Sequence, residues 1–107
     1  MKLLPSLKQK KRYIVFEIIG DQFNAEDTKK SVEEALLLFL GQLGLAKTAP
    51  LFLSEKFKDN KFMIKINHKF VDECKAAIIL IKKIKNKEVI VKSIVTSGTL
   101  KKASGYL

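Results

Sequence analysis

The sequence predicts an α+β sandwich with the ferredoxin-like order β-α-β-β-α-β, also seen in RNA-recognition motifs: a four-stranded antiparallel sheet with two helices on one face. The strands are predicted from short apolar runs rich in β-branched residues at 13–19, 62–66 and 89–96. The helices are predicted from longer stretches, 25–43 and 68–81, in which apolar residues recur every three or four positions. A chain of 107 residues has the length of one domain, so we expect 1–12 to be a basic arm, 13–96 the sandwich core and 97–107 a short C-terminal helix and tail.

The first strand and the first helix have clear boundaries. The strand at 13–19 should place Ile14, Phe16 and Ile18 on one face, because strand side chains alternate. Asn24 is a favourable N-cap for the helix, and Gly44 is predicted to stop it after Leu43. The residues predicted to line its buried face are Val32, Ala35, Leu36, Phe39, Leu40 and Leu43.

The second half of the chain repeats this alternation of strand and helix. A weak strand at 47–56 contains Pro50, which suits a sheet edge, and residues 58–61 form a hairpin turn into the strand at 62–66. Asn67 is predicted to cap the second helix, which should fray into 82–87 before the last strand. In that strand, strict alternation puts 89, 91, 93 and 95 on one face and 90, 92, 94 and 96 on the other. The residues predicted to line the buried face of the second helix are Phe70, Val71, Cys74, Ala77, Ile78 and Ile81.

Positive charge is concentrated at the two ends of the chain. The formal net charge is +10, from 21 basic and 11 acidic residues. Residues 1–12 contribute +5 and residues 82–107 contribute +6, whereas the stretch between them contributes −1. In the predicted topology the first and last strands are antiparallel neighbours, so the start of one lies beside the end of the other. Such a patch of one sign is typical of a site for a polyanion, nucleic acid above all. The residues expected in this patch are Lys8, Lys10, Lys11, Arg12, Ser97, Lys101 and Lys102.

The segment Ser97-Gly98-Thr99 has two interpretations. A hydroxyl, free backbone N–H groups and the two lysines that follow could together hold a phosphate. The simpler interpretation is a helix cap followed by solvated lysines.

Residues able to support catalysis by the chain alone are missing from the sequence. His68 has no predicted nucleophile or orienting partner, so we interpret it as a surface or capping residue. Cys74 falls on the apolar face of the second helix and is interpreted as a buried thiol. The acidic pairs lack metal-ligand spacing, so no bound metal or other cofactor is expected. Tyr13 and Phe16 lie on opposite faces of their strand, which disfavours the base-stacking platform of RNA-recognition motifs.

Both helices carry more apolar residues than one buried face requires. Leu37 and Leu38 lie far from the centre of the first helix's stripe, and Ile79 and Leu80 do the same on the second helix. Single exposed apolar residues are common, but two pairs on one helical layer predict a protein partner. The sequence has no apolar run of about 18 residues and only one cysteine, so a cytoplasmic location without membrane association is expected.

Three stretches spread along the chain resemble the archaeal ribonuclease P protein component 2 family, which also has eukaryotic relatives. They are Leu-Pro-Ser-Leu-Lys-Gln-Lys-Lys-Arg-Tyr-Ile at 4–14, Leu-Gly-Gln-Leu-Gly at 40–44 and Ser-Gly-Thr-Leu-Lys-Lys at 97–102. The resemblance implies a non-catalytic subunit of the ribonucleoprotein that removes 5′ leaders from precursor tRNA. It also implies that the RNA carries the chemistry with magnesium, and that the protein partner is ribonuclease P protein component 3. Self-association within the complex is the alternative use of the exposed apolar pairs. The tail after Lys102 departs from stronger family members because it is short and has no further basic residue.

Two other classes of function fit parts of the sequence. A ribosomal or RNA-chaperone protein would have the same basic ends, and the identity of the bound RNA would separate it from the first interpretation. A small-molecule-sensing module of ferredoxin-like fold is disfavoured by the net charge of +10 and by the lack of an attached catalytic domain.

Overall fold

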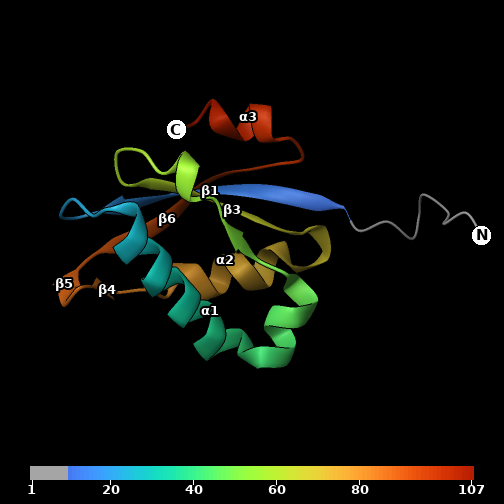
Figure 1. Cartoon of the computed structure of the whole chain (residues 1–107), viewed down its shortest axis with the longest axis horizontal. Coiled ribbons are helices and arrows are strands. Elements are labelled where there is room, and N and C mark those ends of the chain that lie inside the picture. Colours follow the sequence, from blue (N-terminus) through green and yellow to red (C-terminus); the bar gives the residue numbers. More distant parts are fainter. Residues whose placement is uncertain (1–9) are drawn as a thin grey trace, which may run out of the picture.

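The sheet and its strand order confirm the predicted sandwich. The computed structural model describes residues 10–107 and contains a four-stranded antiparallel sheet in the order β2-β3-β1-β6 (Figure 1). The strands are β1 (Lys11–Ile19), β2 (Leu51–Phe52), β3 (Lys61–Asn67) and β6 (Ile90–Ser97). The first and last strands of this sheet are therefore neighbours, and Tyr13 pairs with Ser97 at one end while Ile19 pairs with Ile90 at the other. β1 begins at Lys11, two residues before the predicted start of the first strand.

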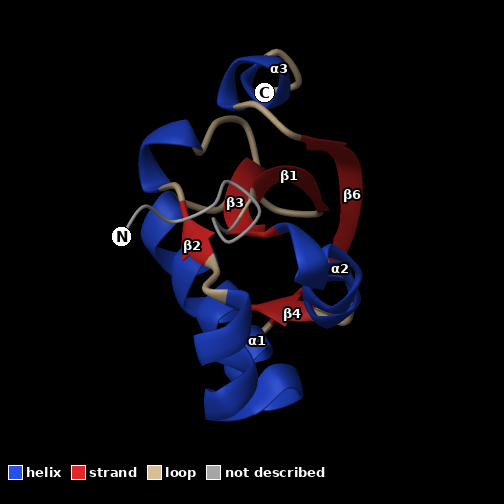
Figure 2. Ribbon diagram, turned by 90° about the vertical axis from the view of Figure 1, so that its right-hand side faces the viewer, coloured by secondary structure: helices blue, strands red, loops and turns tan. Residues whose placement is uncertain are grey.

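Two long helices cover one face of the sheet and a short one covers the other (Figures 1 and 2). α1 (Ala25–Thr48) and α2 (Val71–Ile79) form the expected layer. α3 (Leu100–Ser104) lies on the opposite face, where Ala103 packs in a small apolar cluster with Val15 and Met63. Short 3-10 turns occur at Ser54–Lys56 and at His68–Phe70, and the second of these leads into α2.

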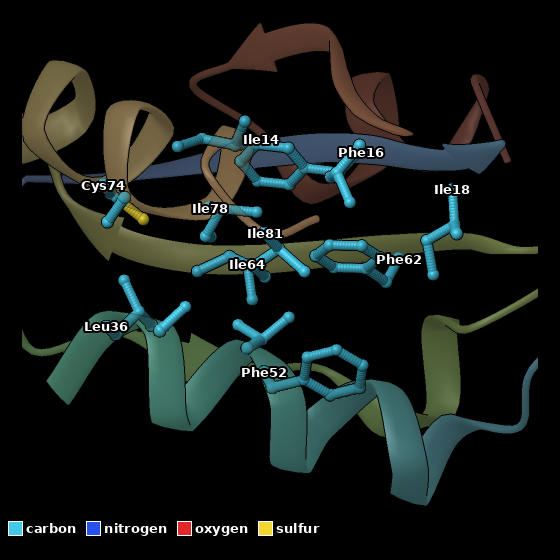
Figure 3. Packing of buried hydrophobic residues seen from close by; sticks show 14 of the residues in the cluster. Ile14, Phe16, Ile18, Leu36, Phe52, Phe62, Ile64, Cys74, Ile78 and Ile81 are labelled. Carbon is cyan, nitrogen blue, oxygen red and sulfur yellow. The ribbon is translucent and has the colours of Figure 1, made fainter. Parts of the chain in front are cut away.

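The main core lies between the sheet and the α1–α2 layer (Figure 3). Ile14, Phe16 and Ile18 all point into it, as their alternation predicts. Phe62 lies between two other rings, with centroid distances of 5.2 Å to Phe16 and 5.5 Å to Phe52. These three stacked rings join β1, β3 and the short edge strand β2 through one contact surface.

The end of α1 differs from the prediction. Asn24 caps the helix as expected and accepts a hydrogen bond from the Asp27 N–H at 2.8 Å. The break, however, occurs at Gly41, whose φ of +70° only glycine adopts readily, and the helical stretch then resumes to Thr48 with Ala49 as the C-cap. The change of direction at Gly41 ends the buried stripe, so Leu43, predicted to be buried, is 80% exposed. Phe39 is half-exposed, because it lines the open groove at the end of α2 rather than the core.

The edge strand is shorter than predicted, but the hairpin turn after it is confirmed. α1 occupies part of 47–56, which leaves only Leu51 and Phe52 to pair with β3. Asp59 and Asn60 both have positive φ in the turn. Asn60 is buried and joins two loops: its amide nitrogen donates to Asp21 O at 2.7 Å, and its Oδ1 accepts from Phe23 N at 3.0 Å.

The segment 82–87 does not continue α2, as the sequence had suggested, but leads into a second hairpin. β4 (Lys83–Ile84) and β5 (Lys87–Glu88) pair across a two-residue turn in which Lys85 and Asn86 both have positive φ. That geometry matches the right-handed twist of a tight hairpin. Burial of Ile84 in the main core anchors the hairpin.

Strict alternation along the last strand was also wrong. Val15 pairs with Val95 but Phe16 pairs with Ser93, so β6 has a bulge at this point. As a result, Val91 faces the main core whereas Val95 packs on the opposite face with the α3 cluster.

Candidate nucleic-acid interface

The basic patch expected from the sequence is built around the first residues of β1. This strand lies between β3 and β6, so its start meets the ends of both neighbours: Lys11 pairs with Asn67, and Tyr13 pairs with Ser97. Lys8 lies outside the described residues, so the structure places the patch from Lys10 onward.

Arg12 lies directly beside the segment that joins β6 to α3. Its Nη1 donates a hydrogen bond to Lys11 O at 3.1 Å. A Cβ added at Gly98 would lie only 3.7 Å from the same Nη1 atom. The guanidinium group and the Ser97–Thr99 turn are therefore side by side, although they are far apart in the sequence.

The two hydroxyls of this turn have structural partners. Ser97 is buried and its Oγ accepts a hydrogen bond from Thr99 N at 3.2 Å. Thr99 is the N-cap of α3, and its Oγ1 accepts from Lys102 N at 3.3 Å. Ser97 therefore shapes the turn, while Lys101 and Lys102 are exposed on the short helix that follows.

Two residues that the sequence did not place in the patch belong to it. The backbone N–H of His68 donates to Lys10 O at 2.9 Å, which extends the β1–β3 ladder by one step. Asn67 then accepts a hydrogen bond from Lys69 N at 3.1 Å and turns the chain, which leaves Lys69 exposed. The antiparallel pairing of 11–17 with 61–67 was the signal that could have located His68 and Lys69 here.

Tyr13 lies on the face of the sheet that α3 covers. Lys65 pairs with it across the strands, and the Lys65 Nζ lies 6.0 Å from the centre of the Tyr13 ring. Tyr13 also packs against the small cluster that contains Ala103 of α3. With α3 on this face, the sheet does not present the open aromatic surface on which RNA-recognition motifs stack bases.

Three other lysines of 82–107 face carboxylates at the other end of the sheet. Lys85 Nζ lies 2.6 Å from Asp27 Oδ2, and Lys87 Nζ lies 3.3 Å from Asp21 Oδ2. Lys92 pairs with Glu17 on the neighbouring strand at 3.4 Å. The excess charge of 82–107 is therefore divided, and only its α3 part lies near the start of β1.

A separate apolar surface lies on the helical layer. Leu37, Leu38, Ile79 and Leu80 are all exposed, with Leu38 at 78%. Leu38 and Leu80 lie on different helices yet line one shallow groove of about 260 Å³, together with Phe39. Glu34, Lys82 and Lys83 also line this groove. Leu38 and Leu80 thus share a surface that a protein partner could cover, whereas Leu37 lines a different hollow, next to Leu51 of β2.

The titratable residues that could support other chemistry have ordinary structural surroundings. Cys74 is fully buried, and burial raises the pKa of its thiol to about 12, so it stays protonated and unreactive at neutral pH. Within residues 10–107, no group of three metal-ligating side chains is found. The helices of the same region include none that is long and apolar enough to cross a membrane.

The chain has clear relatives. It is 36% identical to ribonuclease P protein component 2 from Thermococcus kodakarensis over 94% of this chain and 84% of the relative. It is 33% identical to the protein of the same name from Methanocaldococcus jannaschii, over 94% of this chain and 75% of that one. One chain of the cryo-EM structure of yeast ribonuclease MRP has the same fold, with a TM-score of 0.69, 16% identity, and coverage of 87% of this chain and 77% of that chain. The model of the Rpp14/Pop5 family matches residues 12–107, and the chain therefore belongs to the Rpp14/Pop5 family.

Proposed function

We propose that this chain is a non-catalytic protein subunit of an archaeal-type ribonuclease P. It binds the catalytic RNA and supports the removal of 5′ leaders from precursor tRNA in the cytoplasm. Relatives named ribonuclease P protein component 2, matched over nearly the whole chain, support the assignment to this enzyme.

The basic end of the sheet is the observation that supports RNA binding. Lys10, Lys11 and Arg12 lie at the start of β1, beside the turn that leads to Lys101 and Lys102. These cations come from opposite ends of the chain and are joined only by the fold. Lysine and arginine contacts to phosphates supply affinity with little sequence preference, so the RNA's shape and backbone are what this end would recognise.

The RNA supplies the chemistry in this proposal. Among residues 10–107, the one histidine, His68, lies against a backbone carbonyl, and the one cysteine, Cys74, is buried. The magnesium ions that cleavage requires would then be held by RNA phosphates, and this chain would stabilise the RNA around them by reducing phosphate repulsion.

The exposed apolar residues of the helical layer fit the protein partner. We assign Leu37, Leu38, Ile79 and Leu80 to the contact with ribonuclease P protein component 3, because burying such a surface is favourable and RNA contacts would not cover it. Self-association of this chain within the complex is the alternative use of the same surface.

Affinity measured against salt concentration tests the RNA-binding proposal. Each lost phosphate contact should flatten the plot of log K against log salt by about 0.7–0.9. We expect flatter slopes and weaker binding to an archaeal ribonuclease P RNA when Lys10, Lys11 and Arg12 are replaced by Gln, and again when Lys101 and Lys102 are replaced. If the two sets share one site, their combined effect should be less than additive.

A matched control and a functional assay complete this test. Lys58→Gln changes a lysine in the β2–β3 turn, at the other end of the strands, and should leave the slope unchanged. Reconstitution should raise leader cleavage by the RNA, and the protein alone should not cleave. A wild-type salt slope in both sets of variants would contradict the proposed site, and copurification of the native protein with ribosomal RNA alone would favour the other structural RNA-binding role.

A further inference from the structure

The two sides of the sheet carry opposite charges. α1 and α2, which cover one face, contain six carboxylates and four lysines. α3 lies on the other face, to which alternate side chains of β1, β3 and β6 point (Figure 2). These strand residues and α3 contribute one carboxylate, that of Glu17, and six lysines: Lys11, Lys61, Lys65, Lys92, Lys101 and Lys102. A polyanion is therefore attracted to the α3 side of the sheet and not to the helical layer.

Glu17 divides the α3 side of the sheet into two halves. Its carboxylate forms an ion pair with Lys92 at 3.4 Å, and Lys61 pairs with it from β3, so the half toward the end of β1 is partly neutralised. The half toward the start of β1 has no carboxylate on its strands or on α3. Its lysines are Lys11, Lys65, Lys101 and Lys102.

Lys65 is restrained before any ligand arrives. It pairs with Tyr13 across β3 and β1, and its Nζ lies 6.0 Å from the centre of the Tyr13 ring. An ammonium group over an aromatic face is attracted to the ring, which limits the conformations of the lysine. Tyr13 packs in turn against the cluster that contains Ala103 of α3. The position of the Lys65 ammonium group therefore depends on both the strand pairing and α3.

Lys11 and Lys65 are neighbours of like charge. Lys11 pairs with Asn67, which is two residues along β3 from Lys65, so the two lysines are diagonal neighbours on one face of the sheet. Within residues 10–107, the ion pairs include neither of them. An anion bound by both ammonium groups would relieve their repulsion, and the phosphates of a nucleic acid gain further affinity by releasing counter-ions.

We propose that Lys65 is a further phosphate ligand of the RNA site, positioned by Tyr13, and that the RNA backbone reaches the site across the α3 side of the sheet. The inference rests on the proposed RNA-binding function and deepens it by assigning the side of the molecule that the RNA covers. The helical layer, with Leu38 and Leu80, then points away from the RNA and stays open to a protein partner.

Lysine acylation of the full-length protein shows which side the RNA covers. The probe is a transcribed archaeal ribonuclease P RNA, and a limiting dose of reagent is read out by mass spectrometry with and without it. We expect the RNA to lower the modification of Lys11 and Lys65. Lys30, an exposed residue of α1, should stay as reactive as in the free protein. Protection of Lys30 without protection of Lys65 would overturn the proposed side.

Variants of Lys65 and Tyr13 test the contact and its positioning on the same RNA. Lys65→Gln should flatten the plot of log K against log salt by about 0.7–0.9, the effect of one phosphate, whereas Lys65→Arg should keep the wild-type slope. Tyr13→Phe keeps the ring and should match the wild type. Tyr13→Leu should weaken binding in the wild-type background but not in the Lys65→Gln background, because the ring acts through Lys65. Lys30→Gln is the matched control and should leave the slope unchanged.

The outcomes separate this inference from the proposed function. If the wild type binds the RNA and Lys65→Gln keeps its slope, Lys65 does not contact phosphate and the inference is wrong, while RNA binding stands. If Lys65→Arg binds as weakly as Lys65→Gln, charge at this position is not what the RNA contacts, and the inference fails again. Equal weakening by Tyr13→Leu in both backgrounds would show that the ring acts through folding, which overturns its positioning role. If the folded wild type binds no RNA, the proposed function and the inference fail together.

Discussion

The stacked rings of the core give the most quantitative prediction about this protein. Phe62 has no exposed surface and stacks on Phe16 and Phe52, so Phe62→Ala removes a buried side chain and two aromatic contacts together. A Phe→Ala change in a core costs about 3–5 kcal/mol, and aromatic pairs contribute about 0.5–1.5 kcal/mol each beyond their burial. We expect a loss near the upper end of the first range, since part of the aromatic contribution is already included in it.

Urea unfolding followed by circular dichroism measures this loss. Domains typically have about 5–15 kcal/mol of stability, so the variant should remain folded but close to the threshold. With an m-value of about 1–3 kcal/mol per molar urea, the midpoint should fall by roughly 2 M or more. Phe62→Leu should lose much less, because it fills most of the space.

Phe39→Ala is the matched control for this measurement. Its ring is half-exposed on the groove between α1 and α2, so its truncation should cost less than about half of the Phe62 value. Equal losses for the two Phe→Ala variants would refute the assignment of the three-ring stack as the centre of the core.

Three further predictions concern the partner surface, a backbone position and the buried thiol. Replacing Leu38 and Leu80 with Asp should abolish the pairing with component 3, or self-association, in a pull-down or light-scattering assay while the far-ultraviolet spectrum stays unchanged. Gly20→Ala should lower stability by about 1–3 kcal/mol, since φ is +147° and a Cβ would lie 3.1 Å from Glu88 O. Because burial raises the Cys74 pKa from 9.0 to about 12, the stability that this thiol contributes is complete below pH 9 and should be lost as the pH rises from 9 to 12, by about 1.4 kcal/mol per unit.

Each of these predictions has a control. Normal complex formation by the Leu38→Asp, Leu80→Asp variant would exclude that surface as the interface. Gly98→Ala should be tolerated, because the nearest atom would be 3.7 Å away, so equal losses at Gly20 and Gly98 would contradict the backbone argument. Cys74→Ala should remove this part of the alkaline slope, and an unchanged slope would show that lysine deprotonation alone accounts for it.

The local pattern of apolar and polar residues was enough to predict the order of the main strands and helices. The alternation at 14–18 and the Asn24 cap were confirmed because each depends on neighbouring residues only. The predicted end of α1 at Gly44 was wrong, because the helix breaks at Gly41 instead. Either glycine could interrupt a helix, and which one does so depends on how the following turn packs. The β4–β5 hairpin was not predicted, because its many lysines hide any alternation of apolar and polar residues. Burial of Ile84 is what identifies the hairpin, and that burial depends on tertiary contacts.

The sequence predicted those parts of the candidate site whose positions follow from which strands pair. The prediction that the first and last strands are neighbours correctly placed Arg12 near the Ser97–Thr99 turn. Pairing with β3 was just as informative, and it places His68 beside Lys10. The ion pairs that Lys85 and Lys87 form with Asp27 and Asp21 could not be read from net charge, because they depend on where the hairpin folds back.

The central position of β1 has a consequence for how the protein is made. β1 is the first strand of the described chain, yet one of its two partners, β6, is the last to be synthesised. Contacts so distant in sequence slow folding, and one side of β1 stays unpaired until residues 90–97 have emerged from the ribosome. The proposed phosphate site is completed in the same step, because Arg12 meets Gly98 only when the two strands pair. A partial chain that lacks β6 would therefore lack the full proposed site.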